Sequence, residues 1–111
     1  MDINSEIAVK VLGWEIKHGQ WYEIDHRYQG LIGEFNPSSD IGQCFEYVVP
    51  AMRERGFGLS LCMGVYGVEA IFHKSGFIGS YKAIIDDPTK AALAITTAAI
   101  KAAKAMEGRD D

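Results

Sequence analysis

Apolar residues recur at the three- and four-residue spacing of an amphipathic helix in two segments of the N-terminal half. The first, Ile7–Leu12, follows the capping residues Asn4 and Ser5 and stops at Gly13, a residue that adopts positive φ easily. The second runs from about Asp40 to Arg55 and stops at Gly56. Its apolar stripe predicts a face buried against a sheet, made by Ile41, Cys44, Phe45, Val48, Val49 and Met52.

Proline in this second helix predicts an irregularity. Pro50 has no backbone N–H and its ring clashes with the carbonyl four residues earlier, that of Glu46. We therefore expect a kink, or a change of pitch in the last turn.

The C-terminal segment predicts a long alanine-rich helix. Asp87 is placed at its cap and Pro88 at its first position, and Ala91–Met106 is rich in small side chains. Small side chains allow the helix to lie close to a sheet, and they also offer a flat surface for pairing with a second copy.

Alternating patterns between these helices predict strands. Phe57–Met63, Val68–His73 and Phe77–Ile84 follow one another with glycine-containing turns, as in an antiparallel meander. The segment Trp14–Phe35 alternates loosely and predicts one or two short strands that extend the sheet. The expected fold is α+β, an antiparallel meander with helices on both faces, in a single domain over residues 1–111.

Composition narrows the function classes. The net charge is −4, with 11 Lys and Arg against 15 Asp and Glu, which disfavours a DNA or RNA partner. No apolar run reaches the length of a membrane span, and the acidic N-terminus is unlike a signal peptide. Cys44 and Cys62 are too few for a disulfide framework and are expected to be buried free thiols. These features predict a protein of the cytoplasm with no membrane partner.

The turn before the second helix carries a family resemblance. Asn36-Pro37-Ser38-Ser39-Asp40-Ile41, together with Gly13-Trp14, Phe45, the meander and the alanine-rich helix, resembles the phage ABA-sandwich domain of small phage and prophage proteins. The resemblance implies a helix–sheet–helix sandwich and a viral origin in a bacterial host, without a defined biochemical activity. Pro50 and the long loop between His18 and Gly33 depart from the family pattern.

An aromatic and basic cluster precedes that turn. Aromatic faces stack on bases and arginine binds phosphate with two donors, so this cluster could bind a nucleotide. Burial of the same rings in a core is the alternative reading, preferred for Trp14 and Phe35. The candidate ligand-binding residues are Trp21, Tyr22, His26, Arg27 and Tyr28, completed by Ser38 and Ser39 at the start of the second helix.

The sequence contains no catalytic signature and no metal-ligand spacing. His18, His26 and His73 stand apart from one another, and no serine or cysteine lies in a nucleophile motif. We therefore expect no cofactor, no metal and no catalytic residues. Lys74 and Lys82 are as readily explained by protection of strand edges as by anion binding.

Three function classes remain open. The leading hypothesis is a non-enzymatic phage protein that sequesters a nucleotide-derived immune signal of the host, and that works as a homo-oligomer. The alternative is a protein-binding module that inhibits a host or phage protein through helix one or the alanine-rich helix. The third is a nucleotide-degrading enzyme that uses His26 or His73.

Overall fold

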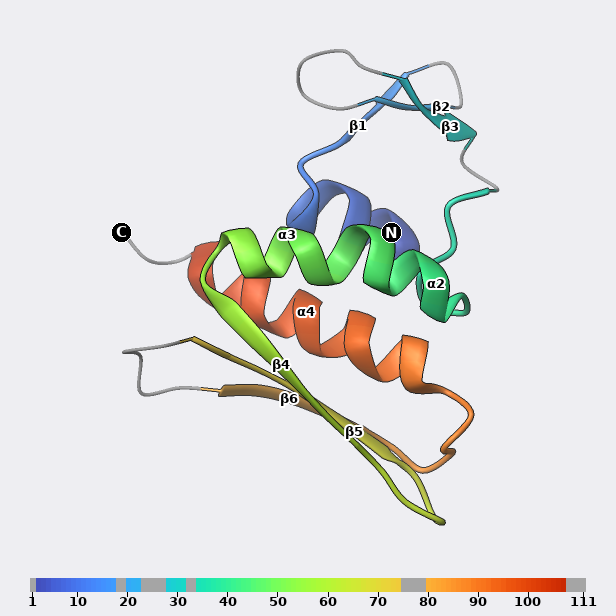
Figure 1. Ribbon diagram of the computed structural model, residues 1–111. Coiled ribbons are helices and arrows are strands. Elements are labelled where there is room, and N and C mark those ends of the chain that lie inside the picture. Colours follow the sequence, from blue (N-terminus) through green and yellow to red (C-terminus); the bar gives the residue numbers. More distant parts are fainter. Residues whose placement is uncertain (1, 18–19, 23–27, 32–33, 75–79, 108–111) are drawn as a thin grey trace.

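The computed structural model describes residues 2–17, 20–22, 28–31, 34–74 and 80–107, with the side chains of 28–31 excepted. Figure 1 shows the helices in one layer, with a sheet on either side of that layer. The elements in chain order are α1 (Ile3–Glu6), η1 (Ile7–Val11), β1 (Glu15–Lys17), β2 (Gln20–Tyr22), β3 (Tyr28–Leu31), α2 (Ile41–Gln43), η3 (Cys44–Val48), α3 (Val49–Glu54), β4 (Phe57–Met63), β5 (Val68–Lys74), β6 (Ser80–Ile85) and α4 (Ala91–Glu107).

The larger sheet is the predicted antiparallel meander, in the order β4-β5-β6. Alternation along β5 works as the sequence predicts: Val68, Ala70 and Phe72 are buried, whereas His73 on the other face is exposed. Helix α4 packs on this buried face, against β5 and β6. The α+β class and the meander are thus confirmed.

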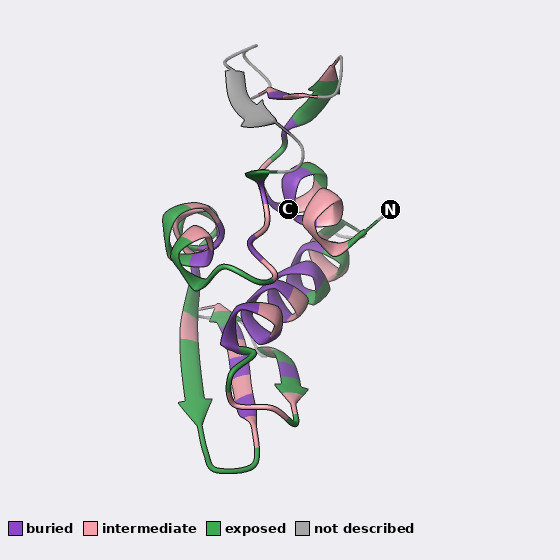
Figure 2. Cartoon of the chain, turned by 90° about the vertical axis from the view of Figure 1, so that its right-hand side faces the viewer, coloured by how far each residue is buried: buried purple, intermediate pink, exposed green. Residues whose placement is uncertain are grey.

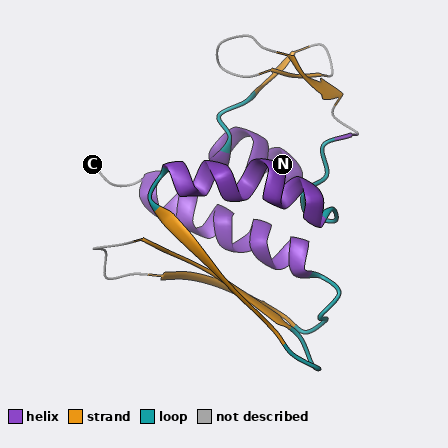
Figure 3. Cartoon of the chain, in the orientation of Figure 1, coloured by secondary structure: helices purple, strands orange, loops and turns teal. Residues whose placement is uncertain are grey.

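The layers are arranged differently from the sandwich that was expected. The described helices lie on one face of β4–β6, and the opposite face is left open to solvent (Figures 1 and 2). The segment after Gly13 does not extend this sheet. Its strands form a second antiparallel sheet, β1-β2-β3, on the far side of the helices (Figure 3). None of the helices in the described part of the chain is long and apolar enough to cross a membrane.

Helix two has a narrower buried face than its apolar stripe predicts. Cys44, Val48 and Met52 are fully buried, but Phe45 is 52% exposed and Ile41 is 42% exposed. The prediction that Phe45 packs in the core is therefore wrong. Cys44, Val48 and Met52 are spaced by four and form the fully buried line of the helix, and Phe45 is rotated away from that line.

The pitch of helix two changes in the turn before Pro50, whereas the sequence predicted a change in the last turn, which is a regular α-helix. Over η3 the backbone hydrogen bonds join residues five apart in the sequence, as where the Val49 N–H donates to the Cys44 carbonyl. A wider turn is one way to accommodate a residue that lacks an N–H and clashes with the preceding turn.

Two helix starts differ from the expectation. Asp2, rather than Asn4 or Ser5, caps α1, and its carboxylate accepts from the Ser5 N–H. Asp87 does not cap a helix at Pro88, because its carboxylate accepts from the N–H and hydroxyl of Thr89 in a separate turn. As a result α4 begins at Ala91.

Candidate functional site

The Asn-Pro-Ser-Ser-Asp turn fastens helix two to helix one. Asn4 donates to Asn36 Oδ1 at 2.9 Å and accepts from the Ser38 N–H at 3.0 Å. Asp40 caps α2 by accepting from the Gln43 N–H, and Gln43 Oε1 accepts from the Asn36 N–H at 2.7 Å. Most polar groups of this motif therefore have structural partners, and Ser39 remains exposed at its outer side.

The aromatic residues before the turn form a core cluster. The Trp14 ring centroid lies 4.7 Å from that of Phe35, 5.5 Å from that of Tyr47 and 6.4 Å from that of Trp21. Burial of Trp14 and Phe35 is confirmed. Trp21 is only 2% exposed, so its faces are already covered and do not offer a stacking surface. Tyr22 is half-buried and donates to Gln20 at 2.9 Å.

The structure does not bring the predicted ligand residues together in one pocket. Ser38 and Ser39 line a depression of about 310 Å³ with Thr89, Lys90 and Leu93 at the start of α4. Trp21 belongs to the sheet on the other side of the helices (Figure 1). His26, Arg27 and the side chain of Tyr28 lie outside the described residues.

An apolar groove adjoins this depression and has a volume of about 460 Å³. Ile41 and Phe45 come from helix two, and Leu61 and Met63 come from the end of β4. Ser39, Thr89 and Ala92 line both hollows, so the two adjoin. We call this feature the α2–β4 groove. It is lined by Ser39, Ile41, Phe45, Leu61, Met63, Pro88, Thr89, Ala91 and Ala92.

Acidic residues adjoin the lining of the α2–β4 groove in the sequence. Asp40 immediately precedes Ile41, and Asp87 immediately precedes Pro88. Hydrogen bonds from Thr89 hold the pKa of Asp87 below its usual value, so this carboxylate is ionised at neutral pH. Lys90 is a basic residue on the adjoining depression.

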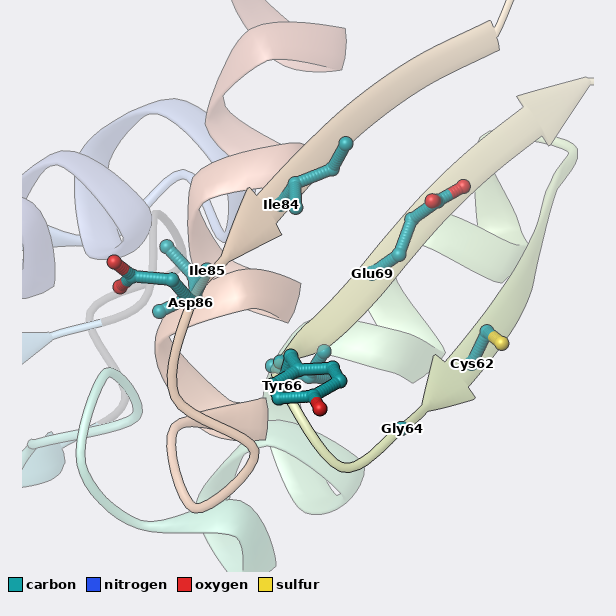
Figure 4. Close-up of a pocket in the computed structure, with 9 residues that line it drawn as sticks. Cys62, Gly64, Tyr66, Glu69, Ile84, Ile85 and Asp86 are labelled. Atoms are coloured by element: carbon teal, nitrogen blue, oxygen red, sulfur yellow. The ribbon is translucent and has the colours of Figure 1, made fainter.

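The open face of the larger sheet carries two polar arrangements that sequence reasoning missed. Ser60 Oγ lies 3.0 Å from His73 Nε2, a contact made because β4 and β5 place both side chains on one face. Figure 4 shows Cys62, Glu69 and Ile84 projecting from β4, β5 and β6 along a third hollow of about 320 Å³. The sequence alone does not predict these neighbours, because they are brought together by the register between strands.

The serine–histidine pair does not amount to a catalytic site. Both side chains are exposed, and among the described residues no carboxylate is bonded to the other ring nitrogen of His73. Nucleophilic catalysis needs a base that is itself oriented by a third group. A cross-strand contact on an open sheet face explains the pair without chemistry.

The two thiols differ in environment. Cys44 is buried and donates to the Pro37 carbonyl at 2.9 Å, and burial raises the pKa of its thiol to about 12. Cys62 is exposed, so the expectation that both thiols are buried is wrong for Cys62. Within the described part of the chain, no group of three or more His, Cys, Asp and Glu side chains is arranged to hold a metal ion.

Comparison with solved structures shows a related fold. A crystal structure of a phage protein from Bacillus cereus ATCC 14579 superposes with a TM-score of 0.68 and 21% sequence identity, over 94% of this chain and 85% of that one. No family model matches this chain, and no curated protein matches it. At this identity the likeness establishes the fold, and the resemblance to the phage ABA-sandwich domain stays a prediction.

Proposed function

We propose that this chain is a non-enzymatic, protein-binding accessory protein of phage origin, whose working surface is the α2–β4 groove. The observation that carries the proposal is the exposure of Phe45 and Ile41 beside Leu61 and Met63, on a helix whose other apolar residues are buried or half-buried. A contiguous apolar patch rimmed by polar residues is typical of a protein interaction site. The phage-protein fold of the Bacillus cereus neighbour supports the viral setting.

The chemistry of the groove defines the partner. The methionine side chain adapts to irregular apolar surfaces, and Phe45 supplies a large aromatic ring. Asp40 and Asp87 beside the groove favour basic residues flanking the apolar ones. The expected occupant is therefore an amphipathic segment of another protein, with an apolar face and lysine or arginine at its edges.

The contact surface differs from the one that the sequence suggested. Helix α4 is enclosed between the sheet and the other helices, and most of its alanines are fully buried. We therefore do not propose α4 as the docking face, nor as the contact through which two chains pair.

Sequestration of a nucleotide-derived signal is a second candidate, favoured by the depression that adjoins the groove. A ligand with its ring against Phe45 and its anionic group toward Lys90, Ser38 and Ser39 would span both hollows. The acidic side chains Asp40 and Asp87 oppose an anion there. Sequestration is the weaker candidate because Trp21, the residue that the sequence predicted to stack on the base, is buried.

A site-specific photo-crosslinking experiment tests the proposal. p-Benzoylphenylalanine replaces Phe45 in one protein and Ile16, which is 55% exposed on β1, in a control. Irradiation in a bacterial host should give one discrete adduct at position 45 that is missing at position 16. The adduct should disappear when Ile41→Lys is added.

Three other outcomes would contradict docking on a protein. Identical adducts from both positions would mean non-specific capture. Release of an intact nucleotide from heat-denatured protein, with no adduct at position 45, would replace docking by ligand sequestration. A chemically altered nucleotide would instead indicate an enzyme.

A further inference from the structure

Strand β4 is an edge strand without the protection that edges usually carry. Among the strands that the structure describes it pairs with β5 alone, and its seven residues Phe57–Met63 include no charge and no proline. The pairing with β5 has no register shift, so no bulge twists the edge away. Edge strands of this kind are templates for pairing with another strand.

The backbone groups at the free edge can be assigned from the ladder. Gly64 donates to the Gly67 carbonyl at 2.9 Å, which makes this the bonded pair that closes the hairpin. Bonded and non-bonded pairs alternate in an antiparallel ladder. The N–H and C=O groups of Leu59, Leu61 and Met63 therefore point away from β5, toward the free edge.

The opposite edge of the same sheet, β6, is protected. By the same alternation the backbone N–H and C=O of Lys82 point away from β5, toward the free edge of β6. The side chain of Lys82 also gives this edge strand a charge. Lys101 Nζ donates to the Lys82 carbonyl at 2.9 Å, so α4 already satisfies one acceptor of that edge. Only one of the two edges is therefore prepared for a partner.

We propose that the partner of β4 is the β4 strand of a second copy of this chain, paired antiparallel across a two-fold axis at Leu61. In that register Leu61 faces Leu61, and Leu59 faces Met63, so the outward N–H and C=O groups of these three residues find their counterparts. An uncharged strand meets its own copy without repulsion. The result is a continuous six-stranded sheet that carries both α2–β4 grooves on one side.

The dimer contact is made mainly by the paired backbones of the two β4 strands, because the side chains of Leu61 and Met63 line the α2–β4 groove. Val65 at this end of the hairpin is 85% exposed and adds apolar surface beside the paired strands.

The oligomeric state of matched lysine variants tests this proposal. At about 50 µM, light scattering should give twice the 12.2 kDa chain mass for the wild type. Leu61→Lys should give the single-chain mass, because it places two like charges at the axis. The control Ile84→Lys, at an exposed apolar site on β6, should remain dimeric.

A cysteine cross-link keeps the proposal testable if Leu61→Lys does not fold. In a Cys62→Ser background, Leu61→Cys should form a reducible dimer in high yield under mild oxidation, and Ile84→Cys should not. The axis places the two Cα atoms about 5.5 Å apart, within the range of a disulfide. A monomeric wild type, a dimeric Leu61→Lys protein, or equal cross-linking at both positions would overturn the proposal.

Discussion

Replacing Met52 and Phe45 by alanine compares a buried and an exposed position of the same helix. Met52 is fully buried, whereas Phe45 is half exposed in the α2–β4 groove. Removing a fully buried methionine leaves a cavity and costs about 2–5 kcal/mol of unfolding free energy. Phe45→Ala removes a side chain that is already half in water and leaves no closed cavity. We expect its cost to be about 1 kcal/mol.

Urea denaturation followed by circular dichroism gives both values. Met52→Ala should lower the midpoint strongly, and Phe45→Ala only slightly, with unchanged m-values in both proteins. The m-value matters because a change in it would indicate altered compactness rather than lost packing. Comparable losses of more than 2 kcal/mol in the two variants would refute the assignment of Phe45 to an open groove.

The two thiols and two glycines provide further tests. At pH 8, iodoacetamide should label Cys62 rapidly and Cys44 only after denaturation, because burial and the raised pKa of Cys44 leave almost no accessible thiolate. Peptide mass spectrometry checks this, and equal native labelling would contradict it. Gly67→Ala should destabilise the hairpin by about 1–3 kcal/mol, since a Cβ there would lie 2.5 Å from the Ile85 carbonyl oxygen. Gly64→Ala, with its nearest neighbour at 4.0 Å, is the matched control in thermal unfolding and should cost less.

The sequence predicted those features that depend on local rules. Alternation along β5 correctly separated Val68, Ala70 and Phe72 from the open face, because side chains of a strand point to opposite faces in turn. Gly13 was correctly placed at positive φ, where a residue without Cβ is favoured. Both depend only on neighbours in the chain.

The arrangement of the layers depends on contacts distant in sequence. An alternating sequence pattern predicts a strand but not the sheet to which the strand belongs. The prediction that the segment after Gly13 extends the meander was therefore wrong. The burial of Trp21 depends on Trp14, and the burial of both depends on how the helices place them. Aromatic residues next to arginine and histidine look the same in a ligand pocket and in a core when only the sequence is read.

The groove had a partial signal in the sequence. Helix two carries more apolar residues than one buried face can take, since Cys44, Val48 and Met52 already fill it. The surplus, Ile41 and Phe45, indicated a second apolar surface. The sequence could not predict that this surface lies beside Leu61 and Met63, because that depends on where the sheet crosses the helix.

The affinity of the cross-linked partner for groove variants tests the central claim most directly. The protein captured at position 45 is purified and titrated calorimetrically against the wild type, Ile41→Lys and Ile16→Lys. Ile41→Lys should weaken binding at least about tenfold, equivalent to about 1.4 kcal/mol, and Ile16→Lys should bind as the wild type does. Equal affinity of all three proteins for that partner would contradict docking in the α2–β4 groove.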